Sequence, residues 1–124
     1  MIGVVTLALA GFHGAYAFLL IRYGEALWSL PTYDTAKATP GGVYIWIFFA
    51  ILSATLLFTG WASKRETIAG AGATVSAVWL VFFALTFGMD AIDDPTPVAL
   101  PGVAIYGSVA LIAAARAGVA LGRM

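Results

Sequence analysis

The stretch GFHGAY, residues 11–16, contains the chain's only histidine, His13, within a long apolar run. If that run crosses a membrane, an ionisable side chain inside it marks a candidate functional site. A single imidazole there can serve a water or proton path, or it can ligate a cofactor. The alternative is a structural role, in which neutral His13 hydrogen-bonds a neighbouring group such as Thr55, Ser76 or Ser108.

Two further polar side chains fall within apolar stretches. Arg116 stands in AAARAG near the C-terminus, and we expect its long side chain to extend toward lipid headgroups. Lining a pore or attracting an anion is the alternative for Arg116. Trp79 lies in the middle of another apolar stretch, where its indole N–H needs a hydrogen-bond acceptor. We expect Trp79 to pack against other helices rather than to stack on a ligand.

Groups for other chemistry are sparse. The chain has no cysteine, which excludes disulfides and thiolate metal sites. It also lacks the G-x-S-x-G and H-E-x-x-H motifs of hydrolases and metalloproteases. We therefore expect no enzyme activity, no bound cofactor and no metal site. The formal net charge is zero and no basic tract occurs, so a nucleic-acid partner is not expected either.

The composition predicts an integral membrane protein. Of the 124 residues, 62% are hydrophobic and 10% are charged, whereas a soluble domain carries about 25% charged residues. A helix needs about 20 apolar residues to cross a bilayer, and four stretches qualify: 2–21, 43–62, 67–89 and 98–115. Backbone groups in lipid must bond within their own segment, so these stretches are expected to be helices. The predicted fold is all-α, with residues 1–124 forming one membrane domain, a four-helix bundle.

The cations predict the orientation. Four spans place both termini and the 63–66 turn on one side, and the loops 22–42 and 90–97 on the other. The first side carries four cations and the second carries two: Lys64, Arg65, Arg116 and Arg123 against Arg22 and Lys37. Because cationic segments stay in the cytoplasm, we expect both termini there, in a protein of the cytoplasmic membrane. The loop 90–97 holds three aspartates and no cation, which suits export.

Small residues predict where the helices meet. Side chains at small-xxx-small spacing let two backbones approach closely in lipid. The candidates for such packing are Ala10, Gly11, Gly14, Ala50, Ala54, Ala69, Gly70 and Ala73. Aromatic residues near the ends of the second span, Tyr44, Trp46 and Trp61, are expected to anchor it at the headgroups.

The layout of the chain resembles a known group of proteins. The stretch LWSLPTYDTAKATPGGVYIWIFF, Leu27–Phe49, is followed by a Lys-Arg turn and a third span that contains Trp79. This arrangement resembles small four-span membrane proteins of actinobacterial phages, some of which are similar to holins. The resemblance implies a phage or prophage origin, and it assigns no functional residues.

Three functions remain open at this point. The first is a holin-like protein, which would form homo-oligomers in the bilayer and make it permeable. The second is a non-catalytic accessory or structural subunit that packs against a larger membrane complex. The third is a small channel or transporter that uses His13. The expected partners are therefore the lipid bilayer and either further copies of the chain or a larger membrane complex.

Overall fold

The computed structural model describes residues 2–23, 42–93 and 100–122, and these residues form four helices without strands. The helices are α1 (Ile2–Arg22), α4 (Gly42–Ser63), α5 (Glu66–Asp93) and α6 (Leu100–Gly122). Each is long and apolar enough to cross a membrane. The all-α, four-helix prediction is thus confirmed for the described ranges. Most of the predicted loop 22–42, and Arg123, lie outside the described residues.

Two helices are longer than the sequence suggested. The third span was expected to end at residue 89, but α5 continues to Asp93, so the predicted loop 90–97 begins as helix. The fourth span was expected to end at residue 115, but α6 continues past Arg116 to Gly122. Charged residues interrupt the apolar run without breaking a helix, because Asp and Arg lower helix propensity only slightly. Pro101 lies in the first turn of α6, where its missing N–H is not needed.

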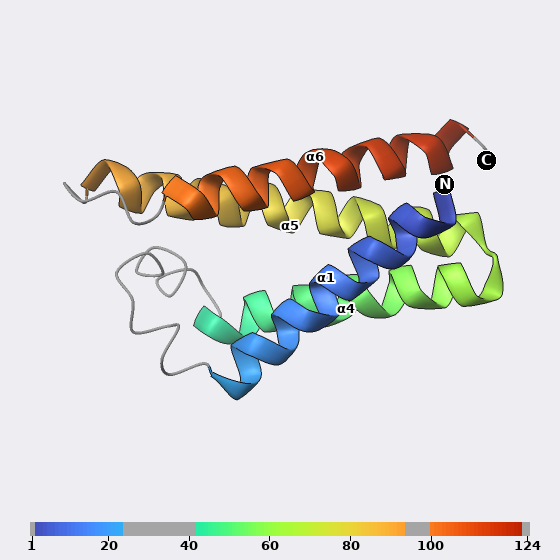
Figure 1. Ribbon diagram of the computed structural model, residues 1–124, viewed down its shortest axis with the longest axis horizontal. Helices are drawn as coiled ribbons and strands as arrows, with labels where there is room; N and C mark the ends of the chain where they lie inside the picture. Colours follow the sequence, from blue (N-terminus) through green and yellow to red (C-terminus); the bar gives the residue numbers. More distant parts are fainter. Residues whose placement is uncertain (1, 24–41, 94–99, 123–124) are drawn as a thin grey trace.

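Consecutive helices run antiparallel and pack side by side, as Figure 1 shows. The most extensive interfaces are those between α1 and α4, between α4 and α5, and between α5 and α6. α1 meets α5 and α6 through far fewer residues. The start of α1, the end of α6 and the α4–α5 turn lie together at one end of the bundle. We call this end of the bundle the turn end and the opposite end the loop end.

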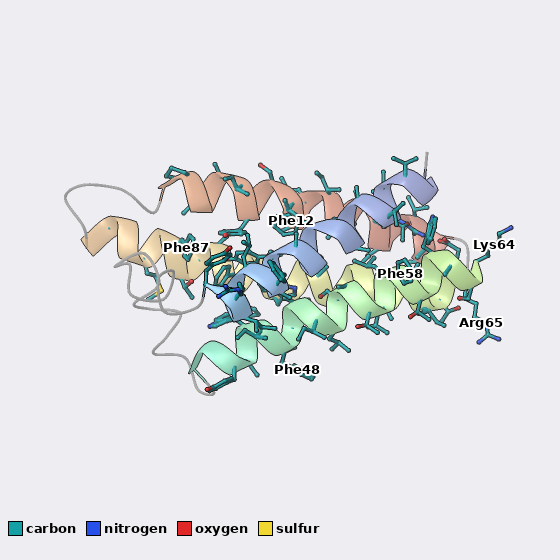
Figure 2. The ribbon with its side chains drawn as sticks, turned by 60° about the horizontal axis from the view of Figure 1, so that its bottom comes forward. Phe12, Phe48, Phe58, Lys64, Arg65 and Phe87 are labelled. Carbon is teal, nitrogen blue, oxygen red and sulfur yellow. The ribbon has the colours of Figure 1, made fainter. Side chains whose placement is uncertain are left out.

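The α4–α5 turn is set by its hydrogen bonds. The Arg65 N–H donates to the Gly60 carbonyl at 3.0 Å, and the Lys64 N–H donates to the Trp61 carbonyl at 3.4 Å. This pair of bonds is the Schellman motif that ends many helices. Lys64 occupies its left-handed position, with φ of 57°, where glycine is the usual residue. Lys64 and Arg65 project outward at the turn end (Figure 2).

Glycines allow α4, α5 and α6 to approach closely. A Cβ built on Gly60 would lie 2.4 Å from the Ala69 backbone nitrogen, and one on Gly70 would lie 2.6 Å from the Ala120 Cβ. Such distances are far below van der Waals contact, so neither glycine tolerates a larger side chain without movement of a helix. Five of the small residues expected at helix contacts are buried: Ala10, Ala50, Ala69, Gly70 and Ala73.

Two of the predicted packing residues lie elsewhere. Gly11 and Gly14 are on the exposed surface of α1, and a Cβ on either would meet nothing within 4 Å. The reason is that α1 turns its other face, with Leu9, Ala10 and His13, to the interior. Ala54 is only half-buried.

Large side chains divide between the interior and the outer surface. Phe83 is fully buried, whereas Phe48 and Phe82 are more than half exposed. Tyr44 and Trp61 are exposed near the two ends of α4, but Trp46, expected at the headgroups, is buried. Trp46 is drawn inward because its ring contacts those of Trp79 and Phe83. The outward-facing residues are as apolar as the buried ones, so the sequence alone does not reveal which face of each helix is inside.

Candidate functional site

Polar side chains occur at several levels of the apolar interior. Within the described part of the chain, the buried ones are Thr6, His13, Ser53, Ser76, Thr86 and Arg116. A buried polar group in such surroundings is costly unless it finds a partner. Five of these side chains take part in three hydrogen-bonded contacts between helices, which lie between the turn end and the middle of the bundle. Thr86 instead donates to the Phe83 carbonyl of its own helix at 2.7 Å.

The first contact is an ion pair at the turn end. Arg116 on α6 donates from Nη1 to Glu66 Oε2 at 3.0 Å and from Nη2 to Glu66 Oε1 at 2.5 Å. Its Nε donates to the Thr6 hydroxyl on α1 at 2.7 Å. Parallel bonds from a guanidinium to a carboxylate are the geometry in which arginine binds most strongly. One side chain thus joins three helices.

The position of Arg116 differs from the prediction that it would extend to the headgroups. Its side chain is 3% exposed, against 30% for Glu66. The difference has a physical reason. Glu66 is the first residue of α5, where the positive end of the helix dipole favours an acid, and the pair neutralises both charges at once. Arg116 therefore bends inward to Glu66 instead of outward.

The second contact lies deeper, between α1 and α5. His13 Nε2 shares a short hydrogen bond with the Ser76 hydroxyl. Ser76 was one of the three hydroxyls expected as partners; the other two, Thr55 and Ser108, are exposed. The ring of His13 lies edge-on to Phe12, with centroids 5.2 Å apart, and 5.3 Å from the ring of Trp79. His13 itself is fully buried.

The other ring nitrogen of His13, Nδ1, does not make such a bond with any described residue. Nδ1 is buried and has no hydrogen-bond partner among the described residues. If Nε2 accepts from Ser76, Nδ1 carries an unsatisfied N–H, and if Nε2 donates, Nδ1 is an unsatisfied acceptor. Leaving such a group unpaired costs about 1–3 kcal/mol. The hydrogen bond to Ser76 therefore satisfies only one of the two ring nitrogens of His13.

The third contact joins α5 to α4. The Trp79 indole N–H donates to the Ser53 hydroxyl at 3.0 Å, which supplies the acceptor that the sequence required. Trp79 is buried and packs among other rings. It serves packing in this arrangement, and it brings an aromatic face against His13.

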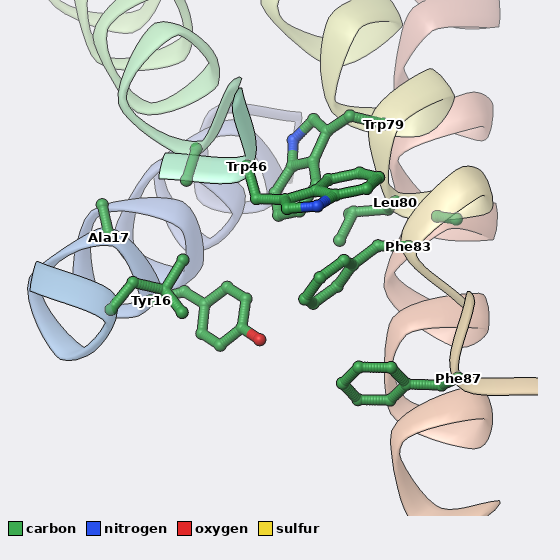
Figure 3. Packing of buried hydrophobic residues seen from close by; sticks show 10 residues of the cluster. Tyr16, Ala17, Trp46, Trp79, Leu80, Phe83 and Phe87 are labelled. Carbon is green, nitrogen blue, oxygen red and sulfur yellow. The ribbon is translucent and has the colours of Figure 1, made fainter. Parts of the chain in front are cut away.

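Aromatic rings fill the interior from His13 toward the loop end. Figure 3 shows Tyr16, Trp46, Trp79, Phe83 and Phe87 converging from three helices. Phe83 is central, with the Trp46 ring at 5.0 Å and the Phe87 ring at 4.9 Å. Tyr106 on α6 contacts Phe83 at 5.1 Å. These rings close this half of the interior.

Small apolar residues fill the interior between His13 and Arg116. This second cluster consists of Leu9, Ala10, Leu57, Ala73 and Ala113. Three of its members, Leu57, Ala73 and Ala113, have no exposed surface. The polar contacts at Arg116 and His13 are thus separated by a tightly packed layer to which all four helices contribute.

A groove runs along the outside of α4 and α5. Its volume is about 600 Å³, and its lining is almost wholly apolar, including Trp46, Val78, Trp79 and Phe82. The groove touches the aromatic cluster from outside. It contains none of the His13, Arg116 or Glu66 side chains.

The structure brings together residues that the sequence left apart. His13 and Trp79 are adjacent, whereas Arg116 lies in a separate contact nearer the turn end. Thr6, Ser53 and Glu66 were not singled out in advance. One signal for Thr6 was available: it lies seven residues before His13, which places both on one face of a helix. Glu66 was placed in the 63–66 turn, and its partner Arg116 is too distant in sequence to be recognised from spacing.

Comparisons with known proteins identify no relative. A scan against protein-family models, a search of curated proteins and a search of solved structures each found no match to the chain.

Proposed function

We propose that the chain is a small multi-pass protein of the cytoplasmic membrane, with both termini in the cytoplasm. Four helices of spanning length support the membrane location. The cations Lys64 and Arg65 are exposed at the turn end, where α1 begins and α6 ends. Since cationic turns stay in the cytoplasm, the turn end is assigned to that side.

Within this frame, we infer that the protein is a small channel or transporter whose path runs through the bundle. The observation that carries this proposal is the buried His13, with one nitrogen on Ser76 and the other unpartnered among the described residues. Ionisable groups inside a membrane protein are costly and typically line ion or proton paths. A second polar contact, Arg116–Glu66, lies nearer the turn end and is partly exposed at Glu66.

Transport through this interior requires movement, because the alanine layer and the aromatic cluster close it. α1 is the helix placed to move, since it has few contacts with α5 and α6. Its polar ties to them include the bonds His13–Ser76 and Thr6–Arg116. When these two bonds open, α1 can tilt on α4 and connect the level of His13 to one side of the membrane.

The holin-like hypothesis is the second candidate, and one observation favours it. Gly11 and Gly14 on α1, with Gly118 and Gly122 on α6, are exposed and have open space around them. Small residues on an outer surface let a second copy approach closely in lipid. A lesion between copies would not depend on His13. The same surfaces suit an accessory subunit, in which case the protein alone would leave the membrane sealed.

The test is reconstitution of the purified protein into liposomes that carry ion gradients. We expect the protein to dissipate a gradient of protons, K⁺ or Cl⁻ faster than protein-free liposomes do. Release of a large trapped dye, together with cross-linked oligomers, would favour the holin-like candidate instead. If correctly inserted protein leaves every gradient intact, the channel or transporter proposal is wrong and the accessory role gains support. Expression in a bacterial host with recording of membrane potential and culture density provides the matching test in cells.

A further inference from the structure

The surroundings of His13 restrict what can pass through the interior. Five residues of the two apolar clusters on either side of His13 have no exposed surface: Leu57, Ala73, Leu80, Phe83 and Ala113. A hydrated ion at this level would have to displace several of these side chains from a close-packed interior. A proton needs only a lone pair on a nitrogen. The packing thus favours the smallest cargo.

The charges near His13 suit the same cargo. Its described neighbours are uncharged: Phe12 on its own helix, and Ser76 and Trp79 on α5. The cation Arg116 on α6 is held by Glu66 and Thr6. A proton that arrives on His13 therefore makes it a charge without a counter-ion among the described residues around it. An unpaired charge in an apolar interior is costly, so the proton does not stay.

We propose that His13 is a proton-binding site and that the translocated species is H⁺. The proposal rests on the channel or transporter function above and names its cargo. Neutral His13, with its proton on Nε2 directed at the Ser76 hydroxyl, takes H⁺ from one side on the lone pair of Nδ1. The imidazolium then releases H⁺ from Nδ1 to the other side after α1 has moved. The ring returns to its starting state, and no other covalent bond forms or breaks.

The test uses liposomes of bacterial phospholipid that contain the protein, a pH-sensitive dye and K⁺. Valinomycin sets an inside-negative potential, which pulls protons inward. We expect the wild-type protein to acidify the interior about a hundredfold or more faster than protein-free liposomes, the lower end of what a positioned proton-transfer group contributes. The His13→Gln variant keeps an amide that can bond Ser76 but has no basic nitrogen, and it should return to the protein-free rate. Ser108→Ala, on the exposed face of α6, is the matched control and should conduct like the wild type.

Three other results would each overturn the proton proposal or the transport function. Proton flux that is unchanged in His13→Gln overturns the assignment of His13. Flux of K⁺ or Cl⁻ without acidification leaves the transport function standing and overturns the proton proposal. Absence of every flux in inserted wild-type protein overturns both.

A direct measurement covers the case in which His13→Gln does not fold. His13 is the only histidine in the chain, so ¹⁵N-histidine labelling gives the two ring-nitrogen signals of one imidazole from the wild-type protein in micelles. We expect the Nδ1 signal to show proton exchange that responds to pH. An imidazole that stays neutral, and exchanges no proton at any pH at which the protein is folded, overturns the proposal.

Discussion

Arg116 and Glu66 form two parallel hydrogen bonds between the end of α6 and the start of α5, at 3.0 and 2.5 Å. The same guanidinium reaches Thr6 on α1. A single charged pair thereby ties together α1, α5 and α6, whose other contacts are mostly apolar. The two partners differ in burial: the Arg116 side chain is almost fully buried, and the Glu66 side chain is partly exposed. Removing Glu66 would therefore leave a buried charge, whereas removing Arg116 would leave a charge that water can reach.

Arg116→Met should destabilise the bundle, because it removes three charge-assisted hydrogen bonds, two to the Glu66 carboxylate and one to the Thr6 hydroxyl. The expected loss is about 2 kcal/mol, less than for a fully buried pair because Glu66 is partly exposed. Thermal unfolding in detergent micelles measures it. The double variant Arg116→Met/Glu66→Met should recover most of the loss, since it leaves no unpaired charge. A double variant as unstable as the sum of the single variants would contradict the pairing.

Gly60→Ala should destabilise the contact between α4 and α5. The new methyl group would lie 2.4 Å from the Ala69 nitrogen, and backbone cannot rotate away as a side chain can. Overpacking of this kind costs about 1–3 kcal/mol. Gly14→Ala is the matched control: its Cβ meets nothing within 4 Å, and alanine favours helix by about 1 kcal/mol. Equal unfolding temperatures for the two variants would show that α4 and α5 are not this close.

Ser53→Ala should weaken the bundle by removing the acceptor of the Trp79 indole N–H. We expect a loss of about 0.6 kcal/mol, the average size of an interhelical hydrogen bond measured by double-mutant cycles in a membrane protein. A double-mutant cycle with Trp79→Phe isolates the bond, since in the Trp79→Phe background Ser53→Ala should cost much less. Additive effects in thermal unfolding would mean that the two side chains do not interact.

Lys64→Gly should stabilise the α4–α5 turn. Lys64 has φ of 57°, a conformation that costs a residue with a Cβ about 1 kcal/mol and costs glycine little. The Schellman bonds of Arg65 and Lys64 are made by the backbone and remain. Lys64→Ala removes the charge without relieving the strain and so serves as the control. If both variants unfold at the same temperature, the gain is not conformational.

The orientation can be tested with single cysteines, because the chain has none of its own. Ser63→Cys and Gly122→Cys lie at the turn end, and Tyr23→Cys lies at the loop end; all three positions are exposed. We expect a membrane-impermeant maleimide to label Tyr23→Cys in spheroplasts and the other two only in inverted vesicles. The reverse pattern would place the termini outside. Labelling of all three from one side would contradict the four-span topology.

Much of the fold followed from hydropathy. Four apolar runs of spanning length predicted the four helices, and the need to satisfy backbone groups in lipid predicted that they would be helical. Ser76 was among the hydroxyls expected to pair with His13, and an acceptor for the Trp79 indole was required. Both conclusions depend on chemistry that is local to one residue: an imidazole or indole at depth must find a partner.

The remaining contacts could not be read from the sequence. The outward faces of these helices are as apolar as the inward ones, so no pattern distinguished Gly11 and Gly14, which are exposed, from Ala69 and Gly70, which are buried. Trp46 was placed at the headgroups because it is an aromatic residue near the start of its span, and no pattern showed that it faces inward. Hydrophobicity indicates burial where one face of a helix is polar, and it cannot distinguish the faces of helices that are apolar all round.

By itself the sequence determined that the chain forms helices of spanning length, how many there are, and which few residues are out of place in an apolar interior. Only the tertiary structure decided how those residues pair. Arg116 meets Glu66 across fifty positions of sequence, and His13 meets Ser76 across sixty-three. Pairing depends on the rotation of each helix about its axis. In these helices that rotation is set by close backbone approach at Gly60 and Gly70, and by the polar bonds themselves, rather than by an apolar stripe.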